Sequence, residues 1–109
     1  MTVQQLKDTL SLTALTLPDG DRAAEGVYIG DLLSWVMGRA QADSVWLTIM
    51  SNLNIVAVAT LADVSCIILC EGVTLEENVR STAEAKGVNI LTTEAPAYET
   101  AKRLSELGL

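Results

Sequence analysis

The hydrophobic positions of this chain recur first at the spacing of a helix and then at the spacing of strands. Val3, Leu6 and Leu10 fall on one face of a helix, and Thr2 with Gln5 forms a capping box at its start. A short amphipathic helix is therefore expected at the beginning of the chain.

Short runs that are apolar or alternate between apolar and polar residues, bounded by turn residues, predict the strands of a sheet. They cover residues 12–17, 26–29, 45–49, 64–69 and 88–91. The first ends in a Pro-Asp-Gly turn, and the run at 64–69 is apolar enough for a strand buried on both faces.

Helical spacing returns between these runs. Asp31 is placed to cap a helix over residues 32–38. Thr74 and Glu77 form a capping box for a helix that ends before Gly87. A last helix is expected over residues 96–107, with three residues facing inward: Tyr98, Ala101 and Leu104.

Residues 54–63 fit two structures. Residues 55–59 have the apolar alternation of a strand, whereas Asn54, Leu61 and Asp63 suit a capped, buried helix. We favour the helix, because the strand at 64–69 needs a connection before it. Strands joined by helices through short links predict parallel pairing with right-handed crossovers. The expected fold is a three-layer α/β/α sandwich with a mostly parallel sheet, in one domain over residues 1–109.

Composition limits the classes of partner. Half of the 109 residues are hydrophobic, and 14 acidic residues against 7 basic ones give a net charge of −7. The basic residues are scattered: Lys7, Arg22, Arg39, Arg80, Lys86, Lys102 and Arg103. Such a surface repels phosphate backbones and anionic lipids, so neither nucleic acid nor membrane is an expected partner.

The two cysteines predict a reducing compartment. Cys66 and Cys70 lie inside an apolar run, and the chain has no histidine to complete a metal set. Residues four apart in a strand are separated by roughly 13 Å, too far for a disulfide.

Nothing in the sequence indicates a targeting or membrane segment. Residues 1–10 do not resemble a signal peptide. Polar residues interrupt the uncharged stretch between Asp43 and Asp63, so this stretch is expected to be buried core and not a membrane span. We expect buried thiols, no metal and a cytoplasmic protein.

The motifs of common enzymes are missing from the chain. Without histidine there is no usual general base, and no serine lies in a Gly-x-Ser-x-Gly elbow. No glycine is followed by lysine, as a P-loop requires, and Gly26 and Gly30 do not match a dinucleotide fingerprint. The sequence therefore predicts a protein that is not an enzyme and has no cofactor.

One place for a ligand is left, at the carboxyl ends of the parallel strands. The candidate ligand-binding residues there are Arg22, Gly30, Asp31, Glu71, Gly72 and Thr93. Three carboxylates, Asp31, Glu71 and Glu94, disfavour a phosphate unless a metal ion bridges them, and could hold Mg²⁺. The alternative is structural: Asp31 as a helix cap, Glu71 as a solvated loop charge and Glu94 as a first-turn acid.

Large side chains gather in the second helix and the strand after it. Trp35, Met37 and Trp46 either fill the core or form a patch that meets a partner. A homodimer is the expected assembly, with a further protein partner as an open alternative.

Several runs of the sequence together resemble the DRTGG domain family over nearly the whole chain. They are Asp21-Arg22, residues 26–34, residues 54–59, residues 67–72 and residues 87–93. The resemblance keeps the Asp-Arg pair at Asp21 and Arg22, whereas the Thr-Gly-Gly portion is found only as Cys70-Glu71-Gly72.

The resemblance implies a fold like the N-terminal domain of HPr kinase/phosphorylase, and the helical form of residues 54–63. It also implies a non-catalytic regulatory and dimerising unit, similar to modules beside CBS domains in regulated pyrophosphatases. Stand-alone members resembling this chain imply an accessory role to iron-only hydrogenase and related redox systems.

Three functions follow, in order of preference. The first is a homodimeric, cytoplasmic regulatory or scaffold domain. The second is a small-molecule sensor, for a nucleotide-like ligand, at the strand ends. The third is a phosphotransfer enzyme with Asp31 or Glu71 as its base.

Overall fold

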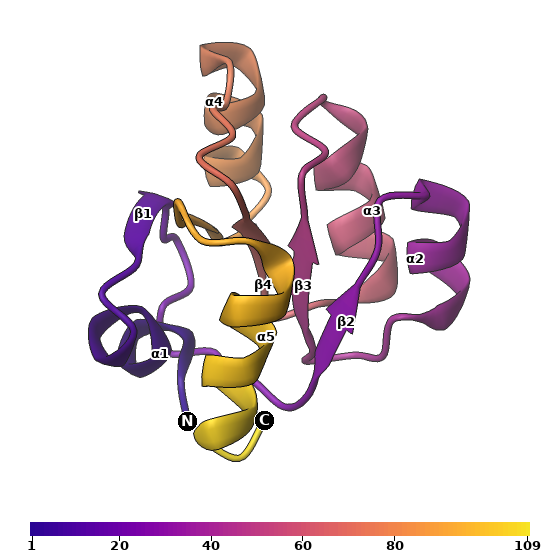
Figure 1. Ribbon diagram of the computed structural model, residues 1–109. Coiled ribbons are helices and arrows are strands. Elements are labelled where there is room, and N and C mark those ends of the chain that lie inside the picture. Colours follow the sequence, from indigo (N-terminus) through magenta and orange to yellow (C-terminus); the bar gives the residue numbers. More distant parts are fainter.

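The computed structural model describes all residues, 1–109, as five strands and five helices (Figure 1). In chain order the elements are α1 (Val3–Thr9), β1 (Thr13–Thr16), β2 (Val27–Ile29), α2 (Leu33–Arg39), β3 (Val45–Thr48), α3 (Asn54–Ala62), β4 (Cys66–Leu69), α4 (Glu77–Ala85), β5 (Ile90–Thr92) and α5 (Ala97–Glu106). All five expected strands are present.

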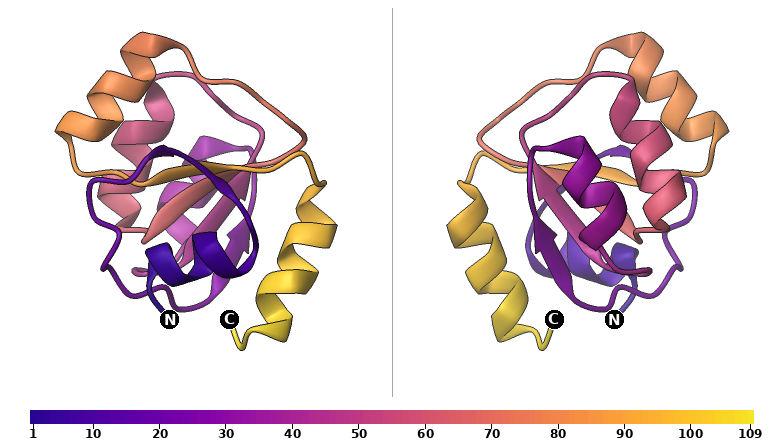
Figure 2. Two further views of the ribbon diagram at one scale, coloured as in Figure 1. Left: turned by 90° about the vertical axis from the view of Figure 1, so that its left-hand side faces the viewer. Right: turned by 90° about the vertical axis from the view of Figure 1, so that its right-hand side faces the viewer.

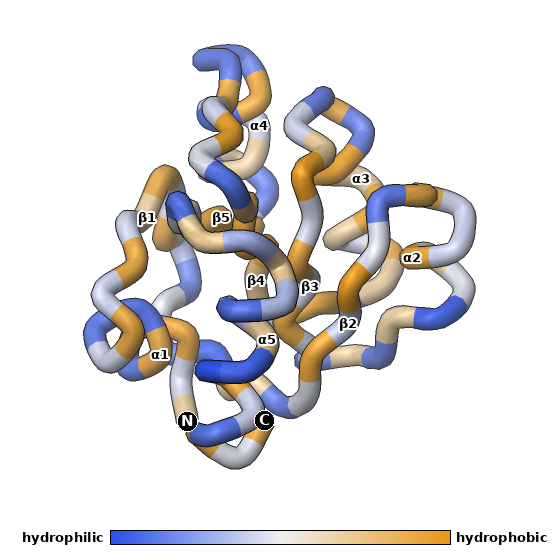
Figure 3. The backbone as a smooth tube through the Cα atoms, viewed as in Figure 1, coloured by the Kyte–Doolittle hydropathy of each residue, from blue (hydrophilic) through white to orange (hydrophobic).

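The sheet has the order β1-β5-β4-β3-β2. Strands β2, β3, β4 and β5 run parallel, because each is joined to the next by a helix, and β1 is antiparallel to β5. The mostly parallel sheet is thus confirmed. The central strands β3 and β4 are among the most hydrophobic parts of the backbone (Figure 3), since helices cover both of their faces.

Alternate strand residues point to two separate cores, one on each face of the sheet. Trp46 and Ile67 pack under α2, α3 and α4, whereas Leu47 and Ile68 pack under α1 and α5. Figure 2 shows α3 and α4 on one side of the sheet and α5 on the other. The three-layer α/β/α sandwich is confirmed.

Two local predictions are confirmed in detail. Thr2 Oγ1 accepts the amide of Gln5 while the Gln5 side chain accepts the amide of Thr2, which is the expected capping box. Residues 54–62 are helical as we favoured, and the helix ends at Asp63 in the left-handed region, with φ 58°.

The expected start of α4 is wrong. The helix begins at Glu77, with Glu76 before it and no side-chain cap, so Thr74 and Glu77 form no capping box. The reason is packing: Val73 and Leu75 both rest against the core, and a spacing of two residues suits an extended chain. The predicted end is right, because Gly87 has φ 74° and Val88 N–H bonds back to Ala83 O.

The expected inward position of Tyr98 is also wrong, because this side chain is 77% exposed. The buried residues of α5 are Thr100 and Leu104, with Ala97 and Ala101 packed beside them. Thr100 tolerates burial because its hydroxyl donates to Pro96 O at 2.9 Å.

Of the three large side chains, only Trp46 fills the core. Trp46 is fully buried, whereas Trp35 and Met37 on α2 are 52% and 46% exposed. Cys66 and Cys70 are buried free thiols, as expected. No helix combines the length and the apolar character needed to cross a membrane.

Candidate functional site

The carboxyl ends of β2, β4 and β5 lie at the same end of the sheet, which we call the strand-end rim. Gly30 and Asp31 follow β2, Glu71 and Gly72 follow β4, and Thr93 follows β5. Because parallel strands all end on the same side, the structure brings these five predicted residues to the strand-end rim.

Arg22 does not belong to the rim, and its expected position there is wrong. Its guanidinium pairs with Asp43 at 3.0 Å and with Asp63 at 2.8 Å. Asp43 precedes β3 and Asp63 precedes β4, so Arg22 lies where the parallel strands begin. Burial alone would lower the pKa of Arg22. The hydrogen bonds with Asp63 and Asp43 outweigh this effect, so the pKa is raised above its ordinary value. The rim therefore lacks the cation expected there.

Asp31 ties the ends of two strands together. Its Oδ1 accepts a hydrogen bond from Thr48 Oγ1 at 2.8 Å and another from Ile49 N at 3.0 Å. It does not cap α2, where no side chain bonds to the first turn, so the expected N-cap role is wrong. Thr48 and Ile49 belong to the end of β3, and this carboxylate satisfies them because the loop after β2 passes directly beside that end.

Gly30 holds the same corner through its backbone. Trp46 Nε1 donates to Gly30 O at 2.9 Å, and Gly30 N donates to Leu47 O at 3.2 Å. A Cβ at position 30 would lie 2.9 Å from the Tyr28 ring. A larger residue at this position would therefore have to displace the Tyr28 ring.

Glu71 and Gly72 form a left-handed turn after β4. Their φ angles are 60° and 71°, and a non-glycine residue such as Glu71 pays a conformational cost there. Gly72 N bonds to Thr93 O at 2.9 Å and Glu71 N bonds to Ala95 O at 3.0 Å. The Glu94 carboxylate, the end of an exposed and flexible side chain, lies against Gly72, so a Cβ at this position would displace it. The turn thus fastens β4 to the segment between β5 and α5.

The electrostatic environment of the rim is acidic. Burial raises the pKa of the Cys70 thiol, and the charges of Glu71 and Asp31 raise it further, while a hydrogen bond with Thr100 opposes the shift. A thiol in this state is protonated and a poor nucleophile at neutral pH. The rim carboxylates do not gather into a set that could hold a metal ion, so the possible Mg²⁺ site is not formed.

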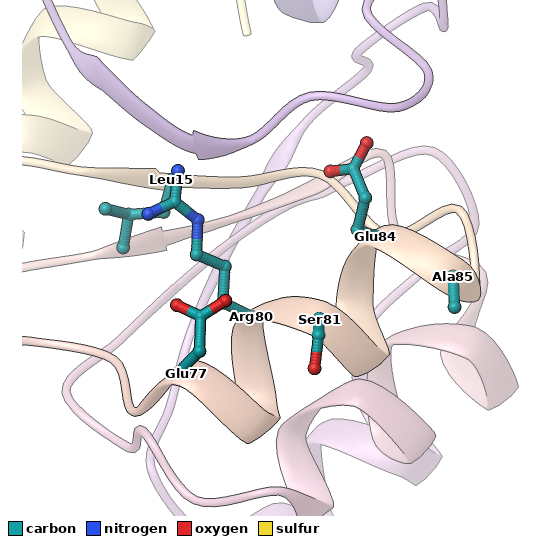
Figure 4. A pocket seen from close by; sticks show the side chains of 6 residues that line it. All are labelled: Leu15, Glu77, Arg80, Ser81, Glu84 and Ala85. Carbon is teal, nitrogen blue, oxygen red and sulfur yellow. The ribbon is translucent and has the colours of Figure 1, made fainter.

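The three surface cavities lie away from the rim. One of about 520 Å³ lies between β1 and α4, where Arg80 extends toward Leu15 and Glu77 stands beside it (Figure 4). A second, of about 490 Å³, is a largely apolar groove between α3 and α4 that ends at Lys86. The third, of about 290 Å³, separates the end of α2 from β2.

Arg39 lines the third cavity and did not stand out among the scattered basic residues. Its guanidinium lies 3.7 Å from the centre of the Trp35 ring, a cation–π contact. The four-residue spacing of Trp35 and Arg39 on a helix was the available signal, because such residues are neighbours on its surface.

Comparison with solved structures finds the regulatory region of a Clostridium perfringens pyrophosphatase, comprising CBS and DRTGG domains, in complex with the activator diadenosine tetraphosphate. The TM-score is 0.71 at 16% identity, and the match covers 93% of this chain and 44% of that one. This chain thus corresponds to less than half of that protein region, and the likeness is one of fold. Comparison with curated protein sequences finds no match.

The sequence itself matches the DRTGG domain over residues 30–107. The matched region contains Cys70-Glu71-Gly72 and begins after Asp21 and Arg22, so the Asp-Arg pair lies outside it. Since the match covers most of the chain and the fold agrees with a solved structure that includes this domain, the chain belongs to the DRTGG domain family.

Proposed function

We propose that this DRTGG domain is a non-catalytic regulatory or scaffold module that acts in the cytoplasm as a homodimer. The observation that carries the proposal is the placement of its exposed apolar side chains. Six of the nine large ones lie between residues 29 and 53, on β2, α2 and the segment around the end of β3: Ile29, Leu32, Trp35, Met37, Ile49 and Leu53. An apolar concentration of this kind marks an interaction surface.

The rim supports the non-catalytic part of the proposal. Its polar groups are used to join strand ends: Asp31 holds Thr48 and Ile49, and Gly72 holds Thr93. A catalytic group must be free to contact a substrate in a cavity, and the surface cavities lie elsewhere.

Light scattering and sedimentation over a wide range of protein concentration test the proposal. A mass of twice 11.6 kDa that dissociates only on dilution is the expected result. A strict monomer at high micromolar concentration would contradict it. As the partner of the scaffold we propose an enzyme of a hydrogenase or related redox system, to be tested by its co-purification with the tagged chain.

A nucleotide-like ligand at the rim is the second candidate function. It is supported by the convergence of Gly30, Asp31, Glu71, Gly72 and Thr93 at one edge. The activator bound by the pyrophosphatase region makes nucleotides and dinucleotides the first ligands to test. Thermal shifts with and without Mg²⁺ test it, and a shift that Thr93→Val abolishes would support it. Transfer of phosphate from ATP to a protein, lost in Asp31→Asn, would instead support the phosphotransfer enzyme.

A further inference from the structure

Helix α2 presents an exposed flank of three residues, Leu32, Trp35 and Arg39, which we call the α2 stripe. Trp35 and Arg39 are four residues apart on the helix and are therefore neighbours on its surface, and Leu32 immediately precedes the helix as its N-cap residue. Leu32 and Trp35 are 56% and 52% exposed, while Val36 on the neighbouring flank is fully buried. The stripe is therefore an accessible surface on a helix anchored from behind.

The stripe is continuous with the free edge of the sheet. Strand β2 is the last strand on its side and pairs only with β3. Arg39 lines one cavity together with Val27 and Tyr28 of β2, and Figure 2 shows α2 beside that strand. An edge strand with unpaired backbone groups and an adjacent apolar helix form one surface that another chain can cover.

The charges at the two ends of the stripe are opposite. Asp31 precedes α2, and only its Oδ1 accepts hydrogen bonds within the chain, which leaves Oδ2 available. Arg39 ends α2 with its guanidinium stacked on the Trp35 ring at 3.7 Å, and it has no carboxylate partner within the chain.

We propose that the α2 stripe packs antiparallel against the same stripe of a second copy, around a two-fold axis near Trp35. This inference rests on the homodimer proposed above and names its interface. Two-fold symmetry reverses the direction of the second helix, so Arg39 of each copy meets Asp31 of the partner subunit. The contact forms twice, and Leu32 and Trp35 fill the space between the two ion pairs.

Charge favours a second copy as the occupant. Each chain carries a net charge of −7, so two copies repel unless a local cation meets an acid at their contact. Asp31 and the α2 stripe together provide this, because the order of acid, apolar pair and cation from Asp31 to Arg39 is complementary to itself when reversed. A partner with an acid at each end would match only Arg39 and would face Asp31 with a like charge.

Cross-linking tests the position of the axis. Trp35→Cys places two identical positions close together at a two-fold axis, so mild oxidation is expected to convert most of the protein to a covalent dimer. The native thiols do not interfere, because Cys66 and Cys70 are buried. Leu61→Cys is the matched control: it is 69% exposed on α3, outside the stripe, and is expected to cross-link only at the slower rate of random collision.

Charge reversal tests the ion pairs in the full chain. Arg39→Glu sets four acids at the interface and is expected to weaken dimerisation by about tenfold or more, while Arg39→Lys keeps it within a few-fold. Circular dichroism and thermal melting establish that each variant is folded. A dimer that Arg39→Glu leaves unchanged and that Trp35→Cys does not cross-link overturns the interface and leaves the homodimer standing. A wild-type chain that stays monomeric overturns both.

Discussion

Arg22 Nη2 lies 2.8 Å from Asp63 Oδ1, and the same nitrogen donates to the Asp63 carbonyl oxygen at 2.7 Å. With the bond to Asp43, this guanidinium joins the N-terminal segment to the two turns that precede β3 and β4. These bonds hold the N-terminal segment against the end of the sheet opposite to the strand-end rim.

Removal of this fastening is expected to destabilise the fold. Arg22→Ala should lower the free energy of unfolding by about 1–2 kcal/mol. The three hydrogen bonds are partly shielded from water on the Arg22 side, which increases the loss, whereas both acids remain largely solvated, which limits it. Urea denaturation measures the change. Lys7→Ala is the matched control, since its single contact is with the neighbouring Asp8 and joins no distant parts of the chain, so its loss should be smaller than that of Arg22→Ala. Equal losses in the two variants would contradict the assignment.

The left-handed turn after β4 predicts a stabilising substitution. Glu71→Gly relieves a backbone cost of about 1–2 kcal/mol at φ 60°, of which glycine returns about 0.5–1 through the entropy of the unfolded chain. A net gain of about 0.5–1 kcal/mol is expected in urea denaturation. A loss of stability would show that the Glu71 side chain makes a contact more important than its backbone cost.

The next residue predicts the opposite effect. Gly72→Ala places a Cβ at φ 71° and pushes aside the exposed, flexible Glu94 carboxylate. The backbone cost of about 1–2 kcal/mol, less about 0.5–1 for the entropy of glycine in the unfolded chain, should leave a loss of about 0.5–1 kcal/mol. Gly38→Ala serves as the control, because nothing lies near its Cβ and alanine is the better helix former by about 0.5–1 kcal/mol. Thermal melting of both variants should give shifts of opposite sign.

Asp31 is expected to act in stability through its acceptor oxygen. Asp31→Ala leaves Thr48 Oγ1 and Ile49 N without their partner and should lower the free energy of unfolding by about 1–2 kcal/mol. Asp31→Asn keeps an oxygen at that position, so its loss should be no more than about half as large. Denaturation of the two variants side by side measures the difference. If Asn is as damaging as Ala, the negative charge itself is what the strand ends require.

Stability is expected to fall at alkaline pH because of the buried thiols. Burial raises the pKa of Cys66 to about 12, above its ordinary value of 9.0, and burial also raises the pKa of Cys70. The folded chain keeps these protons where the unfolded chain releases them, so rising pH favours unfolding. Between pH 9 and pH 12 the loss is about 1.4 kcal/mol per pH unit for Cys66 alone.

Urea denaturation as a function of pH measures this slope, with Cys66→Ala as the variant that lacks it. The same burial predicts that a thiol reagent leaves the native chain unmodified and labels both cysteines once denaturant is added. Rapid labelling of the native chain would show that one thiol reaches solvent.

Local patterns predicted most of the secondary structure. The strand at 64–69 and the capping box of Thr2 and Gln5 depend on neighbours in sequence, and both are present. The start of α4 was misjudged because Thr74 and Glu77 satisfy a local rule that the packing of Val73 and Leu75 overrides. Tyr98 was misplaced because helical spacing alone does not say which flank of α5 meets the sheet.

The candidate site divides in the same way. Gly30, Asp31, Glu71, Gly72 and Thr93 could be grouped from the sequence, since parallel strands necessarily end on one side. Arg22 could not be placed, because its partner Asp63 is 41 residues away and is fixed only by the folded chain. The four-residue spacing of Trp35 and Arg39, which allows them to stack, is visible in the sequence. The exposure of both side chains depends on how α2 packs against its neighbours.

The sequence by itself determined the layered α/β fold, the burial of the two thiols and the absence of histidine chemistry, because these follow from composition and short-range spacing. Only the tertiary structure decided that Arg22 fastens the far end of the sheet, that Asp31 bonds to the end of β3 and that Trp35 faces solvent. Each of these depends on contacts between residues distant in the chain. Many arrangements of such residues agree with one local pattern, and only the packing of the whole domain selects among them.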